Sequence, residues 1–298
     1  MEPVIQNVSK EFDSTPRISE TRRFFRVFFS RGLVTFGLVI IVLFIITAIF
    51  GPLFAPYDPN KQDLSQALVQ PSTDHLLGTD YIGRDTLSRL IYGARLSIMV
   101  GVVALGIAAI IGIISGLLAG YYGGWINAII MRIVDALMSF PMILLALLMA
   151  GLLGGGLKNV MIALGIALIP GYARLMCGQV LSIKESDYVF ACRSFGSGNF
   201  WIMFRHIIPN AMPPLIVLVT MQIGAAILAE AGLSYLGIGI HPPTASWGSM
   251  VNDGFKYLID NPLLSFVPGL AIMLVVFAFN MVGDGLRDAL DPSLRGTL

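Results

Sequence analysis

The sequence predicts an all-α integral membrane protein with six transmembrane helices and both termini in the cytoplasm. Of its 298 residues, 56% are hydrophobic and only 12% are charged, whereas a water-soluble domain carries roughly 25% charged residues. Six apolar stretches between charged side chains offer the roughly 20 residues that a helix needs to cross a bilayer. The net charge of +1 gives no basic excess of the kind that favours nucleic acid, so the lipid bilayer is the expected environment.

The first apolar stretch follows a polar N-terminal tail. We expect residues 1–31 to form a cytoplasmic tail and residues 32–57 to form the first transmembrane helix. Residues 24–31 are basic and aromatic, which is typical of the inner membrane surface. The apolar stretch is too long for the core of a secretory signal and no small-residue cleavage site follows it, so it is interpreted as a retained anchor.

Residues 58–95 are predicted to form an external segment that ends in an interfacial helix. Its last part places apolar residues at helical spacing on one face, namely Leu87, Leu90, Ile91 and Ala94. This pattern predicts a helix lying flat on the outer interface. We expect Thr79 or Asp80 to cap that helix and Asp85 to pair with Arg89 at spacing i, i+4.

Residues 96–285 are predicted to form a five-helix core, followed by a cytoplasmic tail over residues 286–298. A turn-like stretch at 120–127 separates the second and third spans, and the remaining spans are expected at 159–182, 211–236 and 263–283. Small residues recur every four positions along the second span, at Ala104, Ala108, Gly112, Gly116 and Gly120. Such a ladder predicts close packing against another helix of the bundle.

The distribution of Lys and Arg predicts the orientation of the chain. With the N-terminus inside, thirteen basic residues fall on the inner face and six on the outer face, which satisfies the positive-inside rule. The polar segment 184–210 is therefore cytoplasmic. The two cysteines, Cys177 and Cys192, fall on the same side, where a structural disulfide is not expected.

Segment 184–210 contains two short amphipathic helices joined at 196–198. Apolar residues at spacing i, i+3, i+4, i+7 mark one face of each helix, at Tyr188, Ala191, Cys192 and Phe195 and then at Phe200, Met203, Phe204 and Ile207. Pro209 is expected to end the second helix before the fifth span. Two apolar faces exceed what a linker needs, so we expect this segment to dock onto another protein; the alternative is that both faces lie on lipid or neighbouring spans.

Two acidic residues fall near or inside predicted spans, where a charge is costly. Asp135 is expected to pair with Arg132 one turn away. Glu230, toward the outer end of the fifth span, is a candidate contact in a translocation pathway, where it would meet an amino group or another cation. The alternative is a carboxyl group that hydrogen-bonds a neighbouring helix or reaches the outer water.

No catalytic or metal-binding constellation is expected. The histidines His75, His206 and His241 are scattered and lack a second ligand at metal spacing, and no Ser, His and Asp arrangement suggests hydrolysis. Trp247, in the outer loop between the fifth and sixth spans, is interpreted as an anchor at the membrane interface.

The segment "DYVFACRSFGSGNFWIMFRHIIPN", residues 187–210, resembles the cytoplasmic signature of ABC importer permeases. That signature reads Glu-Ala-Ala, three residues, Gly, nine residues, Ile, one residue, Leu-Pro. Its positions are occupied here by Phe190, Ala191, Cys192, Gly196, His206, Ile208 and Pro209. Three of these match the signature strictly, namely Ala191, Gly196 and Pro209, while Phe190 and Cys192 depart from it.

Three longer stretches resemble the C-type permease of dipeptide, oligopeptide and nickel importers, and the resemblance covers about residues 20–295. They are "HLLGTDYIGRDTLSRLIYGARLS", "AEAGLSYLGIGIHPPTASWGSM" and "VPGLAIMLVVFAFNMVGDGLRDALDP". The resemblance implies a type I ABC importer permease in a bacterial or archaeal inner membrane. It also implies four kinds of partner: a homologous B-type permease, two cytoplasmic ATPases, a solute-binding protein and the lipid bilayer.

The resemblance assigns segment 187–209 to coupling with the ATPases during import of di- or oligopeptides or a related solute. The coupling residues it implies are Asp187, Tyr188, Ala191, Cys192, Phe195, Gly196, Phe200, Phe204, Ile208 and Pro209.

The chain itself is expected to bind no cofactor and to hydrolyse no ATP. The motif G-x-x-x-x-G-K-[ST] is absent from the sequence, and the glycine cluster at 151–156 lacks the lysine and hydroxyl that grip phosphate and magnesium. ATP and Mg would be used by the partner subunits. Two alternatives are an ion-coupled secondary transporter that works without ATPase partners and a purely structural membrane subunit.

Overall fold

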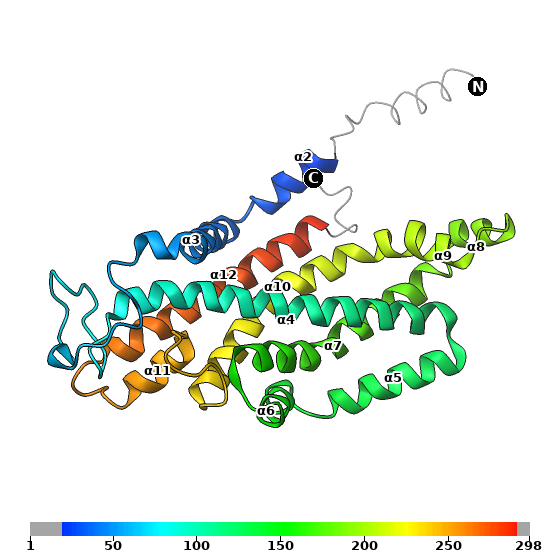
Figure 1. Ribbon diagram of the computed structural model, residues 1–298. Coiled ribbons are helices and arrows are strands. Elements are labelled where there is room, and N and C mark those ends of the chain that lie inside the picture. Colours follow the sequence, from blue (N-terminus) through cyan, green and yellow to red (C-terminus); the bar gives the residue numbers. More distant parts are fainter. Residues whose placement is uncertain (1–19, 291–298) are drawn as a thin grey trace, which may run out of the picture.

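The computed structural model describes residues 20–290, and their secondary structure is helical apart from one isolated bridge between Thr79 and Asp85. Figure 1 shows the helices packed as an elongated bundle. The elements are α2 Glu20–Phe28, α3 Gly32–Phe54, η1 Leu64–Gln66, α4 Thr86–Tyr122, α5 Gly124–Met138, α6 Met142–Leu152, α7 Gly156–Ile183, α8 Asp187–Ser194, α9 Asn199–Ile202, η2 Met203–Ile207, α10 Ile208–Tyr235, α11 Trp247–Phe255 and α12 Leu263–Leu290. Most of the two predicted tails lies outside these residues.

Five of the described helical stretches are each long and apolar enough to cross a membrane, and a bent pair supplies a sixth candidate. The bent pair is α5 and α6, which meet at an angle of 91° where the sequence predicted one continuous span. Pro141 explains the break, because proline has no N–H to continue a helix and disfavours helical backbone in the preceding residue. Here Pro141 is extended (φ −54°, ψ 131°) and precedes the first turn of α6.

Helix α4 is one continuous helix of 37 residues, so the prediction of a separate interfacial helix is wrong. The apolar residues assigned to that helix form the first turns of α4, which runs on without a proline to Tyr122. The predicted caps were also wrong, because the N-cap is Asp85, whose Oδ2 accepts a hydrogen bond of 2.7 Å from the N–H of Ser88. Local periodicity identified a helix here but did not show that it continues into the span.

The small-residue ladder of α4 packs against α7, as predicted. A Cβ atom at Gly112 would lie 2.5 Å from the Cβ of Tyr172, and one at Gly116 would lie 2.3 Å from the carbonyl oxygen of Ala173. Only residues without a Cβ allow the two backbones to approach so closely. The α4–α7 contact is therefore a close backbone seam within the bundle.

Residues 199–235 form a continuous helical run made of α9, η2 and α10, so the expectation that Pro209 separates the second amphipathic helix from the fifth span is wrong. Pro209 lies in the first turn of α10, where a missing N–H does least harm. The π-helical segment η2 precedes it and accommodates the change in hydrogen bonding. The polar segment is thus joined rigidly to α10.

The two ends of the bundle are formed by different elements. Figure 1 shows α11 and the long connection between α3 and α4 at one end, and α8 and α9 at the other. Helix α2 packs beside the C-terminal end of α12, where Arg31 and Asp288 form an ion pair of 2.9 Å. With the bent pair α5 and α6 counted as one span, six candidate spans place both ends of the described chain on the side of α8 and α9, which agrees with the predicted topology.

Trp247 is buried inside the bundle and is not an interface anchor. Its side chain is 3% exposed, its ring lies 5.6 Å from that of Phe44 in α3, and its indole N–H donates a hydrogen bond of 2.9 Å to the carbonyl oxygen of Leu90 in α4. Gly93 leaves the space for it, because a Cβ there would lie 2.5 Å from the indole. Trp247 therefore joins α11 to α3 and α4.

Candidate functional site

Helices α8 and α9 meet at a tight corner formed by Gly196. This glycine has φ of +77°, a left-handed conformation that costs a residue with a Cβ about 1–2 kcal/mol. The N–H groups of Gly196 and Ser197 donate to the carbonyl oxygens of Arg193 and Cys192 at 2.9 and 3.0 Å, which satisfies the end of α8. The glycine at the signature position thus has a local cause in the geometry of this turn.

A set of buried apolar side chains anchors the two helices to the bundle. These are Val189, Ile202, Met203 and Ile207, all 5% exposed or less, and they pack with residues of α4 and α7. Full burial of each such side chain contributes about 1.5–3 kcal/mol. The corner is therefore packed against the spans and not connected to them by the chain alone.

Most of the predicted apolar face of α8 and α9 points outward. The exposed aromatic residues, here called the aromatic surface, are Tyr188 (44%), Phe190 (71%), Phe195 (89%), Phe200 (70%), Trp201 (58%) and Phe204 (53%). The prediction that Met203 and Ile207 share a face with Phe200 and Phe204 is wrong. A π-helical residue turns the chain less than an α-helical one, so η2 rotates Met203 and Ile207 inward.

The remaining predicted coupling residues lie on the same corner. Asp187 begins α8, Ala191 is exposed, Ile208 is partly buried and Pro209 is exposed. Cys192 is partly buried, with its Sγ 3.6 Å from Nε2 of His206. The structure therefore brings these residues together on one protruding corner, and their role in coupling stays a prediction.

Polar contacts connect this corner to the ends of α4 and α7. The hydroxyl of Tyr121 donates a hydrogen bond of 2.9 Å to Oδ1 of Asn199, and the Arg193 guanidinium lies 5.3 Å from the centre of the Tyr121 ring. The Nζ of Lys184 donates to the carbonyl oxygen of Gly120 at 3.0 Å. These contacts tie the corner to the end of α4, and the end of α4 to the end of α7.

Glu230 is enclosed within the chain near the outer end of α10. It is 0% exposed, and its Oε1 accepts a hydrogen bond of 2.7 Å from the hydroxyl of Ser234. The Ser234 hydroxyl in turn accepts a bond of 3.1 Å from the N–H of Ile240. These contacts tie α10 to the turn that follows it, and the pathway contact expected from the sequence stays a prediction.

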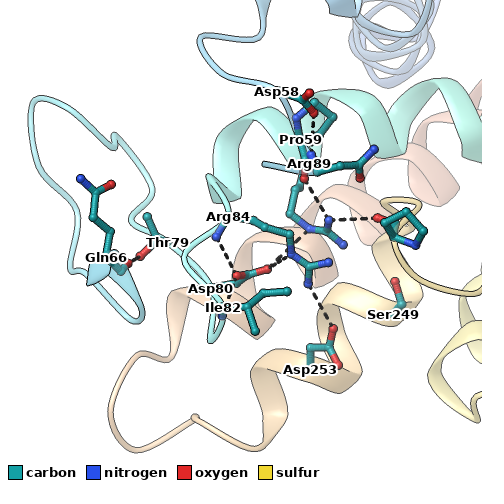
Figure 2. A network of polar contacts seen from close by, with 12 residues as sticks. Asp58, Pro59, Gln66, Thr79, Asp80, Ile82, Arg84, Arg89, Ser249 and Asp253 are labelled. Atoms are coloured by element: carbon teal, nitrogen blue, oxygen red, sulfur yellow. Dashed lines mark hydrogen bonds and ion pairs between the residues drawn. The ribbon is translucent and has the colours of Figure 1, made fainter. Parts of the chain in front are cut away.

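A buried network of charges lies at the end of the bundle that holds α11 and the connection between α3 and α4, and Figure 2 shows its contacts. Arg84, 2% exposed, donates from Nε to Oδ2 of Asp80 at 2.6 Å and lies 3.9 Å from Asp253 of α11. Arg89 lies 3.8 Å from the same Asp80 oxygen and donates to the carbonyl oxygens of Pro59 and Pro243 at 3.1 and 3.3 Å. The network therefore joins the outer connection, α4 and α11.

The charge balance of this network affects Asp253. Burial raises the pKa of its carboxyl group, and this effect outweighs the opposing attraction of Arg84 and Lys256. Charged groups that leave water are costly unless well paired. The anionic form of Asp253 is therefore disfavoured in the folded chain relative to water.

Two ion pairs expected from sequence spacing are replaced by pairs between distant elements. Asp85 contacts His75 at 2.9 Å instead of Arg89, because Arg89 is engaged by Asp80 and two carbonyl groups. Asp135 of α5 pairs with Arg174 of α7 instead of Arg132. Spacing along one helix shows which side chains can form an ion pair. Here each aspartate instead pairs with a residue from another part of the chain.

The sequence did not identify the pairing among Asp80, Arg84 and Asp253. The one signal was the cluster of oppositely charged residues beside Gly78 and Gly83, both of which have positive φ. Among residues 20–290, no group of three or more His, Cys, Asp or Glu side chains could hold a metal ion. The sequence expectation of no metal site stays untested for the chain as a whole.

Comparison with known proteins gives the class of the molecule. Residues 108–296 match the family described as "Binding-protein-dependent transport system inner membrane component", and residues 19–71 match the "N-terminal TM domain of oligopeptide transport permease C". Together with the bundle of apolar helices, this defines a multi-pass permease subunit of an inner membrane. The chain belongs to the family of binding-protein-dependent transport system inner membrane components.

Curated relatives match nearly the whole chain. The dipeptide transport system permease protein DppC of Bacillus subtilis (strain 168) is 42% identical over 97% of this chain and 92% of its own length. The oligopeptide transport system permease protein OppC of the same organism is 44% identical over 90% and 88%. The glutathione transport system permease protein GsiD of Escherichia coli O1:K1 / APEC is 43% identical over 92% and 90%.

A solved structure confirms the fold. A chain from inward-facing conformations of the MetNI methionine ABC transporter superposes with a TM-score of 0.56 at 19% sequence identity, covering 68% of this chain and 96% of that chain. The fold predicted from the sequence, a type I ABC importer permease, is therefore confirmed. This chain is an inner membrane component of a binding-protein-dependent transport system.

Proposed function

We propose that this chain is the C-type subunit of an importer for dipeptides, oligopeptides or a related small peptide. The names of the relatives support this substrate class, since they include dipeptide, oligopeptide and glutathione permeases at 42–44% identity. The proposed complex contains a homologous B-type permease, two cytoplasmic ATPases and a solute-binding protein that delivers the peptide at the outer side. Family membership disfavours the ion-coupled alternative, which needs no ATPase partners.

The observation that carries the coupling proposal is the aromatic surface of α8 and α9. Six large aromatic side chains are exposed there, while the backbone beneath them is fixed to α4 and α7. Soluble protein surfaces rarely expose apolar patches of this kind unless a partner covers them. In our proposal the covering partner is an ATPase subunit, with Phe195 and Phe200 inserted into its surface.

The proposed mechanism is alternating access driven by the partner subunits. ATP binding brings the ATPases together, and the movement reaches the spans through the corner, because α9, η2 and α10 are continuous. The rotation of α10 opens the pathway outward, and hydrolysis returns it to the inward-facing state. The chain contributes no ATPase site in this scheme, so ATP and Mg are bound only by the partners.

The proposal is tested with the complete complex in proteoliposomes. Wild-type complex should take up a dipeptide in a reaction that needs ATP and the solute-binding protein, and the two ATPases should co-purify with the permeases. Phe195→Asp and Phe200→Asp should release the ATPases. The matched control is Ile259→Asp, a residue 98% exposed at the opposite end of the chain, which should retain them.

Two results would contradict the proposal. Uptake of peptide by this chain alone would show that no ATPase partner is required. Retention of both ATPases by the double variant Phe195→Asp, Phe200→Asp would show that the aromatic surface is not the docking element.

A further inference from the structure

Two cavities lie along α7 and α10 between the α5–α6 bend and the corner of α8 and α9, and together they are here called the groove. Its first part is a cavity of about 300 Å³ lined by Phe140 at the bend, Gly171 of α7 and Gln222 of α10. Its second part is a cavity of about 470 Å³ lined by Leu175 of α7 and Leu218 of α10. Residues four apart lie on one helix face, so the two cavities follow the same stripes of both helices.

Unpaired amide side chains line the groove. Gln222 lies in its first part and Gln179 in its second, and neither side chain has a hydrogen-bond partner among the described residues. Each amide is both a donor and an acceptor. Lipid hydrocarbon offers neither, and leaving such groups unpaired in it costs several kcal/mol, so this groove faces something polar.

Prolines and glycine along the groove change the hydrogen bonding of its backbone. Pro170, Pro213 and Pro214 line it, and each lacks the N–H that would engage the carbonyl group four residues earlier. Gly171 lines the groove and Gly178 precedes the lining residue Gln179; a Cβ atom at either glycine would meet nothing within 4 Å. The prolines therefore leave carbonyl groups of α7 and α10 without their usual helical partner, and Gly171 leaves open space beside them.

The charge of the groove indicates what it accommodates. Its only charged lining residue in the described part of the chain is Arg287, in the second cavity. A neutral wall of amides and carbonyl groups can pair with the N–H and C=O groups of a bound peptide, whatever the side chains of that peptide. The Arg287 guanidinium can pair with its terminal carboxylate. An acidic or purely apolar solute would find little complementarity in the neutral part.

The groove is mechanically connected to the corner. Asn210 lines its second part and donates from Nδ2 to the hydroxyl of Tyr188 in α8 at 3.3 Å and to the carbonyl oxygen of His206 at 2.7 Å. A shift of α8 therefore moves one wall of the groove directly. This places the groove where ATPase movement would change its width.

We infer that the groove between α7 and α10 is the wall that this chain contributes to the translocation pathway, and that Gln179 and Gln222 hydrogen-bond the backbone of the transported peptide. The inference rests on the proposed peptide import. It assigns recognition of the common backbone, not of side chains, to this subunit.

Accessibility of single cysteines tests the inference in the complete complex. The background is Cys177→Ala, Cys192→Ala, in which the second change restores the alanine of the signature. Gly171→Cys and Gly178→Cys add a thiol in open space, and the matched control is Gly106→Cys in α4, where a Cβ also meets nothing within 4 Å. A water-soluble thiol reagent is applied during ATP turnover, with and without dipeptide.

We expect the reagent to label both groove cysteines and the dipeptide to slow that labelling several-fold, with no protection at Gly106→Cys. Gln179→Leu and Gln222→Leu should each raise the KM for dipeptide uptake by about two- to tenfold, the worth of one hydrogen bond. Thr220→Val is the control, because the Thr220 hydroxyl already bonds the carbonyl oxygen of Ile216 at 3.0 Å; it should leave KM unchanged.

Two outcomes overturn the inference while leaving peptide import intact. They are wild-type KM in both glutamine variants, or groove cysteines that dipeptide does not protect, in complexes whose ATP-dependent uptake is normal. Absence of ATP-dependent dipeptide uptake in the wild-type complex would instead contradict the proposed function itself.

Discussion

The hydroxyl of Tyr121, at the end of α4, donates a hydrogen bond of 2.9 Å to Oδ1 of Asn199, the first residue of α9. This bond joins the longest helix of the described chain to the corner that we propose docks the ATPases. A hydrogen bond of this kind contributes about 0.5–1.5 kcal/mol. Its loss should loosen the corner without unfolding the bundle.

Tyr121→Phe is therefore expected to lower dipeptide-stimulated ATP hydrolysis by the complex while leaving its thermal unfolding temperature nearly unchanged. The measurement is ATPase activity with and without dipeptide and binding protein. Tyr122→Phe is the matched control, because Tyr122 is 48% exposed and its hydroxyl makes no hydrogen bond within the described chain. Equal stimulation in Tyr121→Phe and wild type would argue against transmission through this bond.

Gly116→Val should destabilise the permease strongly. The new Cβ would lie 2.3 Å from the carbonyl oxygen of Ala173, and two backbones cannot separate there without opening the α4–α7 seam. Overpacking typically costs about 1–3 kcal/mol, and contact with backbone places this substitution at the upper end. Thermal unfolding in detergent measures the effect, with Gly106→Val as the control in open space; equal stability of both variants would contradict the close packing.

Arg84→Met should destabilise the outer end of the chain. The substitution leaves Asp80 with one fewer cationic partner in a buried site, and breaking a buried ion pair costs about 3–5 kcal/mol. Proteolysis of the connection between α3 and α4 should become faster, while Lys61→Met, in the same connection, should have no effect. Unchanged proteolysis in Arg84→Met would show that the network does not hold this segment.

Asp253→Asn should stabilise the chain at neutral pH. Because burial raises the pKa of the Asp253 carboxyl group, the folded state binds a proton that the unfolded state releases as the pH rises. The resulting destabilisation begins as the pH rises through the usual value of 3.8 and is complete above the raised pKa. The gain in unfolding temperature should therefore be present at pH 7 and vanish at acidic pH; a gain that persists at low pH would have another cause.

Glu230→Gln should assemble normally, because glutamine can still accept the hydrogen bond from Ser234. Since the side chain is enclosed in this chain, we expect ATP-dependent dipeptide uptake to be retained. Uptake that falls while assembly stays normal would support the pathway contact predicted from the sequence. The comparison is made on the complete complex, with KM for dipeptide as the measured quantity.

Spans could be predicted from the sequence because membrane crossing depends on length and apolar composition. The predicted first, fourth, fifth and sixth spans agree with α3, α7, α10 and α12 to within about two turns. The α5–α6 bend was missed because Pro141 can kink a helix slightly or break it, and the sequence alone does not say which. The continuity of α4 was missed because its sequence changes from partly polar to apolar near residue 96. Such a change was interpreted as the boundary between two helices, although the helix continues through it.

The corner of α8 and α9 could be located from its amphipathic spacing and its signature glycine, but not its inner and outer faces. Those faces depend on η2, and a π-helical segment has no local sequence signal of the kind that caps and turns possess. The prediction of ion-pair partners was wrong for a related reason. Arg174 is distant from Asp135 in the sequence and comes near it only because α5 and α7 pack together.

The unbroken α4 has a mechanical consequence. At 1.5 Å per residue its 37 residues span about 55 Å, well beyond the thickness of the hydrocarbon layer. Its first turn holds the charge network at one end, and its last turn holds Asn199 at the other. Because this one helix is held at both ends, a movement at one membrane surface is carried along its axis to the other. In the proposed importer, binding of the solute-binding protein outside would thus be linked to nucleotide binding inside.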